Sequence, residues 1–256
     1  MFVTIKRESK LQRFLPTLIN NQCLDDLEYE KNYPSGSSPA KIYGSPKMHK
    51  PFDSNSLPNF RPIVSSIGTY NYNLSKYVCE LLSPNLPNEF CTTDTFTFVE
   101  ELKEVSINNK FLVSYDVNSL FTSIPLKETI KLAVDLIKTS HPNLKISSDN
   151  LTKLFKFATC ETHFLFNGKF YDQIDGVAMG SPLAPVLANL FMGRNEKLWL
   201  ENFQGTPPSY YRRYVDDIFS VFDNTFETNE FFNNINTRHP NIKFTMETEI
   251  KKIILF

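Results

Sequence analysis

Two adjacent carboxylates, Asp216 and Asp217, stand between two short runs of β-branched and aromatic residues in the stretch 211–222. Such runs favour strands, and the break between them predicts a hairpin with both acids at its tip. Like charges at a tight turn raise the free energy of ionisation, so we expect a cation there, most simply a metal ion. A purely structural turn explains the pair equally well until partners are found. A second doublet, Asp25-Asp26, has polar neighbours and is interpreted as a solvated helix face.

A third acid, Asp116, ends the apolar stretch that begins at Phe111. The stretch predicts a strand, and a carboxylate at a strand end is held rigidly at the rim of a sheet. Asp116 alone also fits a turn or a helix-leading aspartate. Pro125 suits the first turn of a helix, and the apolar face that follows includes Ile130 and Ile137.

A basic arm is predicted over residues 41–61, where four Lys or Arg residues stand against one acid. The stretches 41–51 and 60–66 are each expected to contain a strand, with a polar loop between them. Lys47 supplies a point charge and Arg61 a bidentate fork for phosphate oxygens, so the arm fits phosphate binding. A solvated basic hairpin is the alternative.

Two glycines four residues apart, Gly176 and Gly180, predict a close approach of the backbone to another group. Ser181, followed by Pro182, predicts the start of a long helix. A glycine loop that only caps a core helix is the alternative. Upstream, the Asn-Gly pair in the stretch 164–171 predicts a hairpin with a type I′ turn.

The composition fits one large domain or two interleaved subdomains, with 256 residues of which 41% are hydrophobic. The four cysteines form no Cys-x-x-Cys pair, which indicates small buried thiols in a reducing compartment. Because the chain has no signal peptide and no run of about 18 apolar residues, we expect an intracellular protein, in the nucleus or cytoplasm, without a membrane partner. The net charge of −1 restricts any nucleic-acid contact to local basic patches.

Five segments, taken in order, resemble the motifs of a reverse transcriptase. Their residues are most similar to those of the Penelope-like retroelement branch, which is related to telomerase. The resemblance extends over about residues 34–250. The segments are 43–51 with 61–64 (fingers motifs), 116–125 (motif A), 176–189 (motif B), 214–217 (motif C) and 239–247 (the segment after motif C).

The resemblance implies an α+β fold, with the fingers and palm of a right-hand polymerase and an antiparallel palm sheet backed by helices. It also implies the domain limits. These are an N-terminal helical extension at 1–33, fingers at about 34–108 and 140–175, palm at about 109–139 and 176–250, and a truncated end at 251–256. We expect the thumb, and the GIY-YIG endonuclease of many Penelope-like elements, to be absent.

The implied activity is RNA-directed DNA synthesis by a retrotransposon fragment, in which dNTPs are added to a primer 3′ hydroxyl on an RNA or DNA template. Two Mg²⁺ ions, or Mn²⁺ in their place, would be held by Asp116 and Asp216, with Asp217 as the third acid and the Val117 carbonyl as a further ligand.

The resemblance also implies substrate contacts. Lys47 and Arg61 would bind the triphosphate, and Phe121 would act as a steric gate against a 2′ hydroxyl. Gly180 and Ser181 would lie under the nascent base pair.

The sequence departs from many relatives at Met179, where they have Gln, and it offers Lys243 as a candidate proton donor to pyrophosphate. Two alternatives stay open: a retroelement relic that folds without polymerising, and a domesticated nucleic-acid-binding protein. A palm-type nucleotide cyclase would not explain the Gly180-Ser181-Pro182 segment.

Overall fold

The computed structural model describes residues 2–48, 57–160 and 162–248. Its contacts divide the chain into two interleaved units, Met1–Asn85 with Pro125–Leu187 (unit 1) and Leu86–Ile124 with Ala188–Phe256 (unit 2). The end of the predicted stretch 41–51 (His49, Lys50 and Pro51), the first part of the polar loop after it (residues 52–56) and the predicted end segment 251–256 lie outside the described residues. The predicted fingers and palm limits stay predictions.

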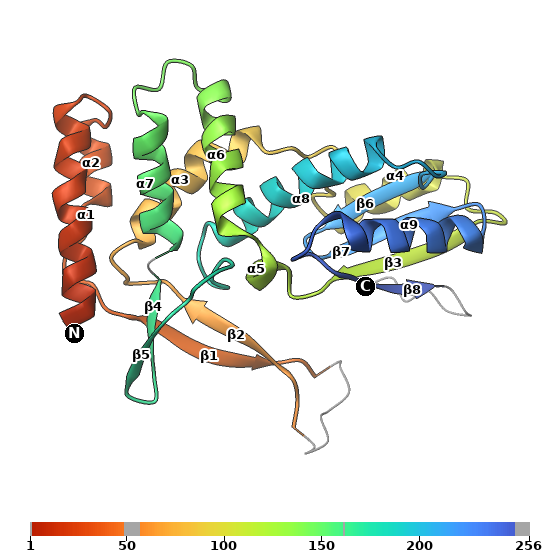
Figure 1. Ribbon diagram of the computed structural model, residues 1–256, viewed down its shortest axis with the longest axis horizontal. Coiled ribbons are helices and arrows are strands. Elements are labelled where there is room, and N and C mark those ends of the chain that lie inside the picture. Colours follow the sequence, from red (N-terminus) through yellow and green to blue (C-terminus); the bar gives the residue numbers. More distant parts are fainter. Residues whose placement is uncertain (1, 49–56, 161, 249–256) are drawn as a thin grey trace. The chain divides into compact units, whose positions relative to one another are not determined.

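Unit 1 contains a group of helices built on apolar stripes (Figure 1). In the first, Leu11, Leu15 and Leu18 are fully buried at the spacing of one helix face. The helices are α1 (Phe2–Asn20), α2 (Asp26–Asn32), α3 (Tyr72–Leu82), the 3₁₀ turn η1 (Ser83–Asn85), α6 (Leu126–Ser140) and α7 (Ser148–Thr159).

The doublet Asp25-Asp26 is solvent-exposed as predicted, but its first member is not on a helix face. Asp25 precedes α2, accepts a hydrogen bond from the Glu28 amide at 2.7 Å and donates its own amide to the Glu28 carboxylate at 2.9 Å. This reciprocal pair is a capping box, which satisfies donors that a helix start leaves unpaired.

A four-stranded sheet completes unit 1, in the order β2-β1-β4-β5. All neighbours are antiparallel except β1 and β4. The predicted type I′ hairpin is confirmed, because Asn167 and Gly168 both have positive φ, 47° and 73°. The strands are β1 (Ala40–Pro46), β2 (Phe60–Ser65), β4 (His163–Phe166) and β5 (Lys169–Asp172).

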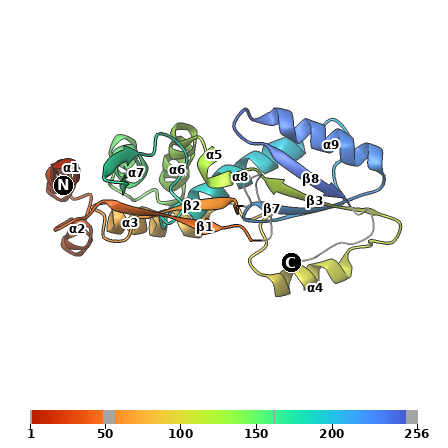
Figure 2. The same cartoon turned by 90° about the horizontal axis from the view of Figure 1, so that it is seen from below.

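Unit 2 is built on an antiparallel sheet in the order β6-β7-β3-β8. Figure 2 shows α9 on one face of this sheet and α4 on the other. Alternation along the strands directs Tyr115 and Phe222 to the face where Phe231 of α9 packs. The elements are α4 (Thr95–Glu104), β3 (Phe111–Val117), α5 (Leu120–Ser123), β6 (Tyr210–Tyr214), β7 (Asp217–Phe222), α9 (Thr225–Arg238) and β8 (Phe244–Thr248).

The α+β fold class with an antiparallel sheet backed by helices is therefore confirmed. The long helix α8 (Ala184–Glu201) contains the division between the two units. It begins three residues after the predicted cap, Ser181, whose Oγ accepts a hydrogen bond from the Leu183 amide at 3.3 Å. Within the described parts of the chain, no helix has the length and apolar composition needed to cross a bilayer.

Candidate active site

The three predicted acids occupy adjoining backbone positions at one end of the unit 2 sheet. Asp116 of β3 lies directly opposite Asp217 of β7 in the antiparallel register, so their side chains share a face. Opposed residues in such a pair have Cβ atoms about 5 Å apart. Asp216 precedes β7, and its carbonyl accepts a hydrogen bond from the Val117 amide at 2.9 Å. Both strands thus deliver carboxylates to one place.

The donor chemistry of these acids suits a divalent cation. Like charges directly opposite each other destabilise a sheet, and a bound cation reverses that effect. Over the described ranges, no group of three or more His, Cys, Asp or Glu side chains is assembled for a metal ion. Mg²⁺ does not require one, because it commonly binds through one or two carboxylates together with water and substrate phosphates. One or two of the carboxylates of Asp116, Asp216 and Asp217, together with water and phosphate oxygens, would therefore suffice for Mg²⁺.

The hairpin turn differs from the sequence prediction. Tyr214 pairs with Asp217, so the two residues at the tip are Val215 and Asp216, and Asp217 is the first residue of β7. Val215 has a φ of 57°, in the left-handed region. A β-branched residue is strained there, which is why the alternation of residue types did not predict it at the tip.

The buried side chain of Arg213 contacts the backbone of this turn. The Arg213 side chain is completely buried, and its Nε donates to the Glu196 Oε1 at 2.7 Å. Its Nη1 donates to both the Asn189 Oδ1 and the Val215 carbonyl, each at 3.0 Å. Its Nη2 contacts the Cys91 Sγ at 3.1 Å. The guanidinium thereby joins α8 to the backbone of the acidic turn.

Electrostatics within this cluster are those of a buried ion pair. Burial opposes the charge of Arg213, but the nearby Glu196 raises its pKa above the usual value. The Tyr211 hydroxyl donates to the same Glu196 oxygen at 2.9 Å, and burial first, then the Glu196 charge, raises the pKa of Tyr211 well above its usual range. These shifts favour the charged form of Arg213 and the neutral form of Tyr211.

The sequence analysis did not predict Arg213, Glu196 or Asn189 as site residues. The sequence contains one indication of this cluster. Tyr211 and Arg213 are two residues apart on a predicted strand, so their side chains share a face. An arginine on the buried face of a strand needs an acid partner from elsewhere in the chain. Its partner, Glu196, lies 17 residues away on a helix, and local patterns do not specify that pairing.

Phe121, the predicted steric gate, lies in the single-turn helix α5 of unit 2, in a partly buried position. Ser119 precedes that helix with a φ of 51°, and its carbonyl accepts hydrogen bonds from the Thr122 and Ser123 amides at 3.0 and 3.1 Å. The turn after Asp116 is therefore fixed by its own backbone bonds.

Lys47 and Arg61 lie in unit 1, on the ribbon formed by β1 and β2. Arg61 is exposed and pairs with Ser45, and the Lys47 amide donates to the Asn59 carbonyl at 2.7 Å just beyond the ribbon. Lys47 therefore lies two residues along the chain from Ser45, the register partner of Arg61. Their role toward a triphosphate stays a prediction.

Gly180 has a backbone reason for being glycine. Its φ is +112°, and a Cβ added there would lie 2.7 Å from the Val64 carbonyl oxygen. The same loop is bonded to β2 and to the residue after it: the Val64 amide donates to the Met179 carbonyl at 2.7 Å, and the Ser66 hydroxyl donates to the Gly180 carbonyl at 3.0 Å. The predicted close approach is confirmed, and β2 is what the loop approaches. Ser181 is buried beside it.

Lys243, the candidate proton donor, is engaged at the end of α9. Its Nζ donates to the Asn236 carbonyl at 2.8 Å and to the His239 carbonyl at 3.4 Å. A cation at a helix C-terminus stabilises the unpaired carbonyls there, and this contact explains the lysine without catalysis.

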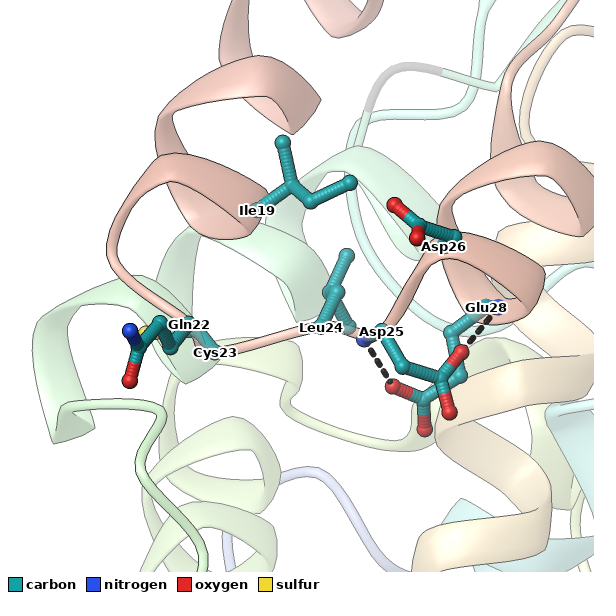
Figure 3. A pocket seen from close by; sticks show the side chains of 7 residues that line it. All are labelled: Ile19, Gln22, Cys23, Leu24, Asp25, Asp26 and Glu28. Carbon is teal, nitrogen blue, oxygen red and sulfur yellow. Dashed lines mark hydrogen bonds between the residues drawn. The ribbon is translucent and has the colours of Figure 1, made fainter.

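A surface hollow at the turn between α1 and α2 contains none of the predicted site residues. It is lined by Ile19, Gln22, Cys23, Leu24, Asp25, Asp26 and Glu28 (Figure 3). Two of its three carboxylates form the capping box of α2, so its acidic character has a structural cause.

Several solved structures share the fold. Telomerase from Candida albicans in complex with a fragment of telomeric RNA gives a TM-score of 0.58 at 12% identity, over 84% of this chain and 43% of that one. Apo telomerase from Candida tropicalis truncated from its C-terminal domain gives 0.54 at 13%, over 86% and 52%. The RNA-dependent RNA polymerase of BmCPV gives 0.53 at 11%, over 95% and 24%.

The chain therefore spans about half or less of the length of these polymerases. No curated protein sequence matches it. The family model for reverse transcriptases matches residues 47–253, which include the acids of β3 and of the hairpin. Since that match covers most of the 256 residues and the fold agrees with it, the chain belongs to the reverse transcriptase (RNA-dependent DNA polymerase) family.

Proposed function

We propose that this chain carries the catalytic residues of an RNA-directed DNA polymerase, which adds dNTPs to a primer 3′ hydroxyl by two-metal nucleotidyl transfer. The observation that carries the proposal is the position of Asp116 opposite Asp217, with Asp216 in the adjoining turn. Nucleotidyl transfer requires carboxylates that converge from separate strands, and this arrangement supplies them.

Asp116 and Asp216 would hold two Mg²⁺ ions, with Mn²⁺ as the alternative, and the Val117 carbonyl and Asp217 would complete or orient the ligand set. The metals supply activation of the attacking hydroxyl and stabilisation of the triphosphate charge. The contribution of the chain is to fix the ligands on paired strands, where the backbone bond between Val117 and Asp216 limits their movement.

The remaining roles concern the substrates. Lys47 and Arg61 would contact the triphosphate, Phe121 would exclude a 2′ hydroxyl, and Gly180 with Ser181 would border the nascent base pair. A template-primer duplex would be the partner, and the description of the Candida albicans telomerase as a complex with telomeric RNA supports a nucleic-acid partner for this chain. The resemblance of the motif residues to those of Penelope-like elements supports a retroelement origin.

Extension of a labelled DNA primer on an RNA template tests the proposal. We expect Mg²⁺-dependent incorporation of dNTPs by the wild-type chain and a loss of about 10²- to 10³-fold in Asp216→Asn, since metal stabilisation contributes several kcal/mol to the transition state. Asp26→Asn is the matched control, because it removes an acid of the exposed doublet and should leave synthesis unchanged.

Equal rates in Asp216→Asn and Asp26→Asn would contradict the assignment of the acid. Template binding without any synthesis would favour a relic or a domesticated binding protein. In that case, Lys47→Ala with Arg61→Ala should weaken template binding, and unchanged binding would remove the arm from both explanations.

A further inference from the structure

We propose that Arg213, together with Glu196 and Asn189, is a positioning unit that sets the backbone of the acidic turn and so the affinity of the site for divalent metal. The inference rests on the proposed function, and it concerns residues that do not themselves contact metal or substrate.

The Arg213 guanidinium fixes the peptide group that precedes Asp216. The Val215 carbonyl and the Asp216 amide belong to one peptide group, and Nη1 of Arg213 fixes that carbonyl at 3.0 Å. The next carbonyl, that of Asp216, accepts from the Val117 amide at 2.9 Å. Both peptide groups that flank the Asp216 side chain are therefore anchored, one to a buried cation and one to β3.

The turn at Val215 needs a restraint from outside the hairpin. Val215 is in the left-handed region at a φ of 57°. Such a backbone conformation costs about 1–3 kcal/mol and persists only where the surrounding structure enforces it. The charge-assisted hydrogen bond from Arg213 provides that restraint at the strained residue itself.

Arg213 is itself held by hydrogen bonds to several different partners. Nε binds Glu196 on α8, Nη1 binds Asn189 about two turns earlier on the same helix, and Nη2 contacts Cys91. Its backbone is also held on both sides, by the Phe90 carbonyl at 2.7 Å and the Thr92 amide at 2.9 Å. A lysine has no planar fork and cannot make these bonds together.

The buried pair of Arg213 and Glu196 is not explained by a contribution to stability alone. Both side chains are fully removed from water, and desolvation of a buried pair often exceeds its Coulombic gain. Within the described residues, the second oxygen of the Glu196 carboxylate accepts no hydrogen bond, which adds to the cost. A geometric role for the pair explains why an apolar pair does not occupy these positions.

The experiment compares full-length Arg213→Lys and Arg213→Met with Arg212→Lys and Arg212→Met. Arg212 is the matched control because it is the next residue of β6, but its Nε binds Glu101 at 2.6 Å in a partly exposed pair. Apparent Mg²⁺ affinity in primer extension, kcat and KM for dNTP are measured, together with direct Mn²⁺ binding by electron paramagnetic resonance.

We expect both Arg213 variants to bind Mn²⁺ and Mg²⁺ about 10- to 100-fold more weakly, the usual loss when a residue that orients metal ligands is removed. kcat should fall at fixed subsaturating Mg²⁺, while KM for dNTP stays within a factor of about three. Excess metal should restore part of the rate, which a general loss of folding would not allow. The Arg212 variants should match the wild type.

Folded Arg213 variants with wild-type metal affinity would overturn the proposal. If the Arg213 variants do not fold, Asn189→Ala decides, because it removes one partner of Nη1 from a partly exposed position. It should weaken metal binding about three-fold, and unchanged binding would again overturn the proposal. A wild-type chain that binds Mn²⁺ but does not polymerise would refute the proposed function and leave this inference testable by Mn²⁺ binding alone.

Discussion

At the scale of single residues, Gly180 is a position where two separate restrictions coincide. Its positive φ disfavours any side chain, and the Val64 carbonyl occupies the space of a Cβ. Gly36 has a positive φ of 65° but no atom within 4 Å of the position where its Cβ would be. A comparison of substitutions at these two glycines therefore separates the cost of backbone strain from the cost of steric exclusion.

Gly180→Ala should be more destabilising than Gly36→Ala. Strain alone costs about 1–2 kcal/mol for a left-handed residue, so we expect a change of that size or less in the free energy of unfolding for Gly36→Ala. Gly180→Ala should exceed it, because Ala must also displace the backbone that bonds Met179 to Val64. Urea unfolding measures both, and equal losses would show that the contact with β2 relaxes freely.

At the scale of elements, α4 depends on one face of the hairpin. The helix has no fully buried residue. Its Phe98 ring packs against Phe219, and its Glu101 carboxylate accepts from the Tyr210 hydroxyl at 2.9 Å and from Arg212. The hydrogen bond from Tyr210, then Arg212, lowers the pKa of Glu101 below its usual value.

This pKa shift predicts an acid-sensitive contact. A carboxyl whose folded-state pKa is lowered contributes stability above its unfolded pKa, near 4.3, and loses it as the pH falls through the lower folded value. Glu101→Gln should therefore reduce stability at pH 7 by about 0.5–1 kcal/mol and lose less than the wild type between pH 7 and pH 3. Glu100→Gln is the control, since Glu100 is exposed and its carboxylate pairs with exposed Lys103 on the same helix.

Thermal unfolding monitored by circular dichroism at both pH values checks this. Parallel pH profiles for Glu101→Gln and the wild type would show that the carboxylate does not anchor α4.

Most elements could be predicted from local patterns. The strand with Asp116, the helix after Pro125 and the Asn167-Gly168 hairpin follow from periodicity and turn chemistry, and all three are confirmed. The tip of the acidic hairpin could not be predicted, because Val215 adopts a backbone conformation that its residue type disfavours. The pairing of Arg213 with Glu196 could not either, because tertiary contacts specify it.

At the scale of the whole molecule, the chain passes between the two units three times, at residues 85–86, 124–125 and 187–188. The family could be predicted from five ordered motifs because their residues are dictated by chemistry. Length and composition allowed either one large domain or two interleaved subdomains. They could not decide between these arrangements, because they do not specify which segments contact each other. The motif A and motif C acids lie in unit 2, and the basic arm and Gly180 in unit 1.

The interleaving predicts how fragments behave. In the structure, β3 pairs only with β7 and β8 among the described strands, and both follow residue 216. A fragment 1–187 should therefore keep the unit 1 helices folded while residues 86–124 lose their structure. Hydrogen exchange should show rapid exchange of the β3 amides and protection in α6 and α7. Protected β3 amides would show that this strand is stable without its partners.

The left-handed Val215 has a consequence for protein engineering. Stabilising substitutions are easiest to find where a native residue conflicts with its backbone, and glycine or asparagine at position 215 would relieve such a conflict. A screen for heat resistance alone would therefore tend to select changes one residue away from Asp216. Because Asp216 is a proposed metal ligand, such a screen should also select for DNA synthesis.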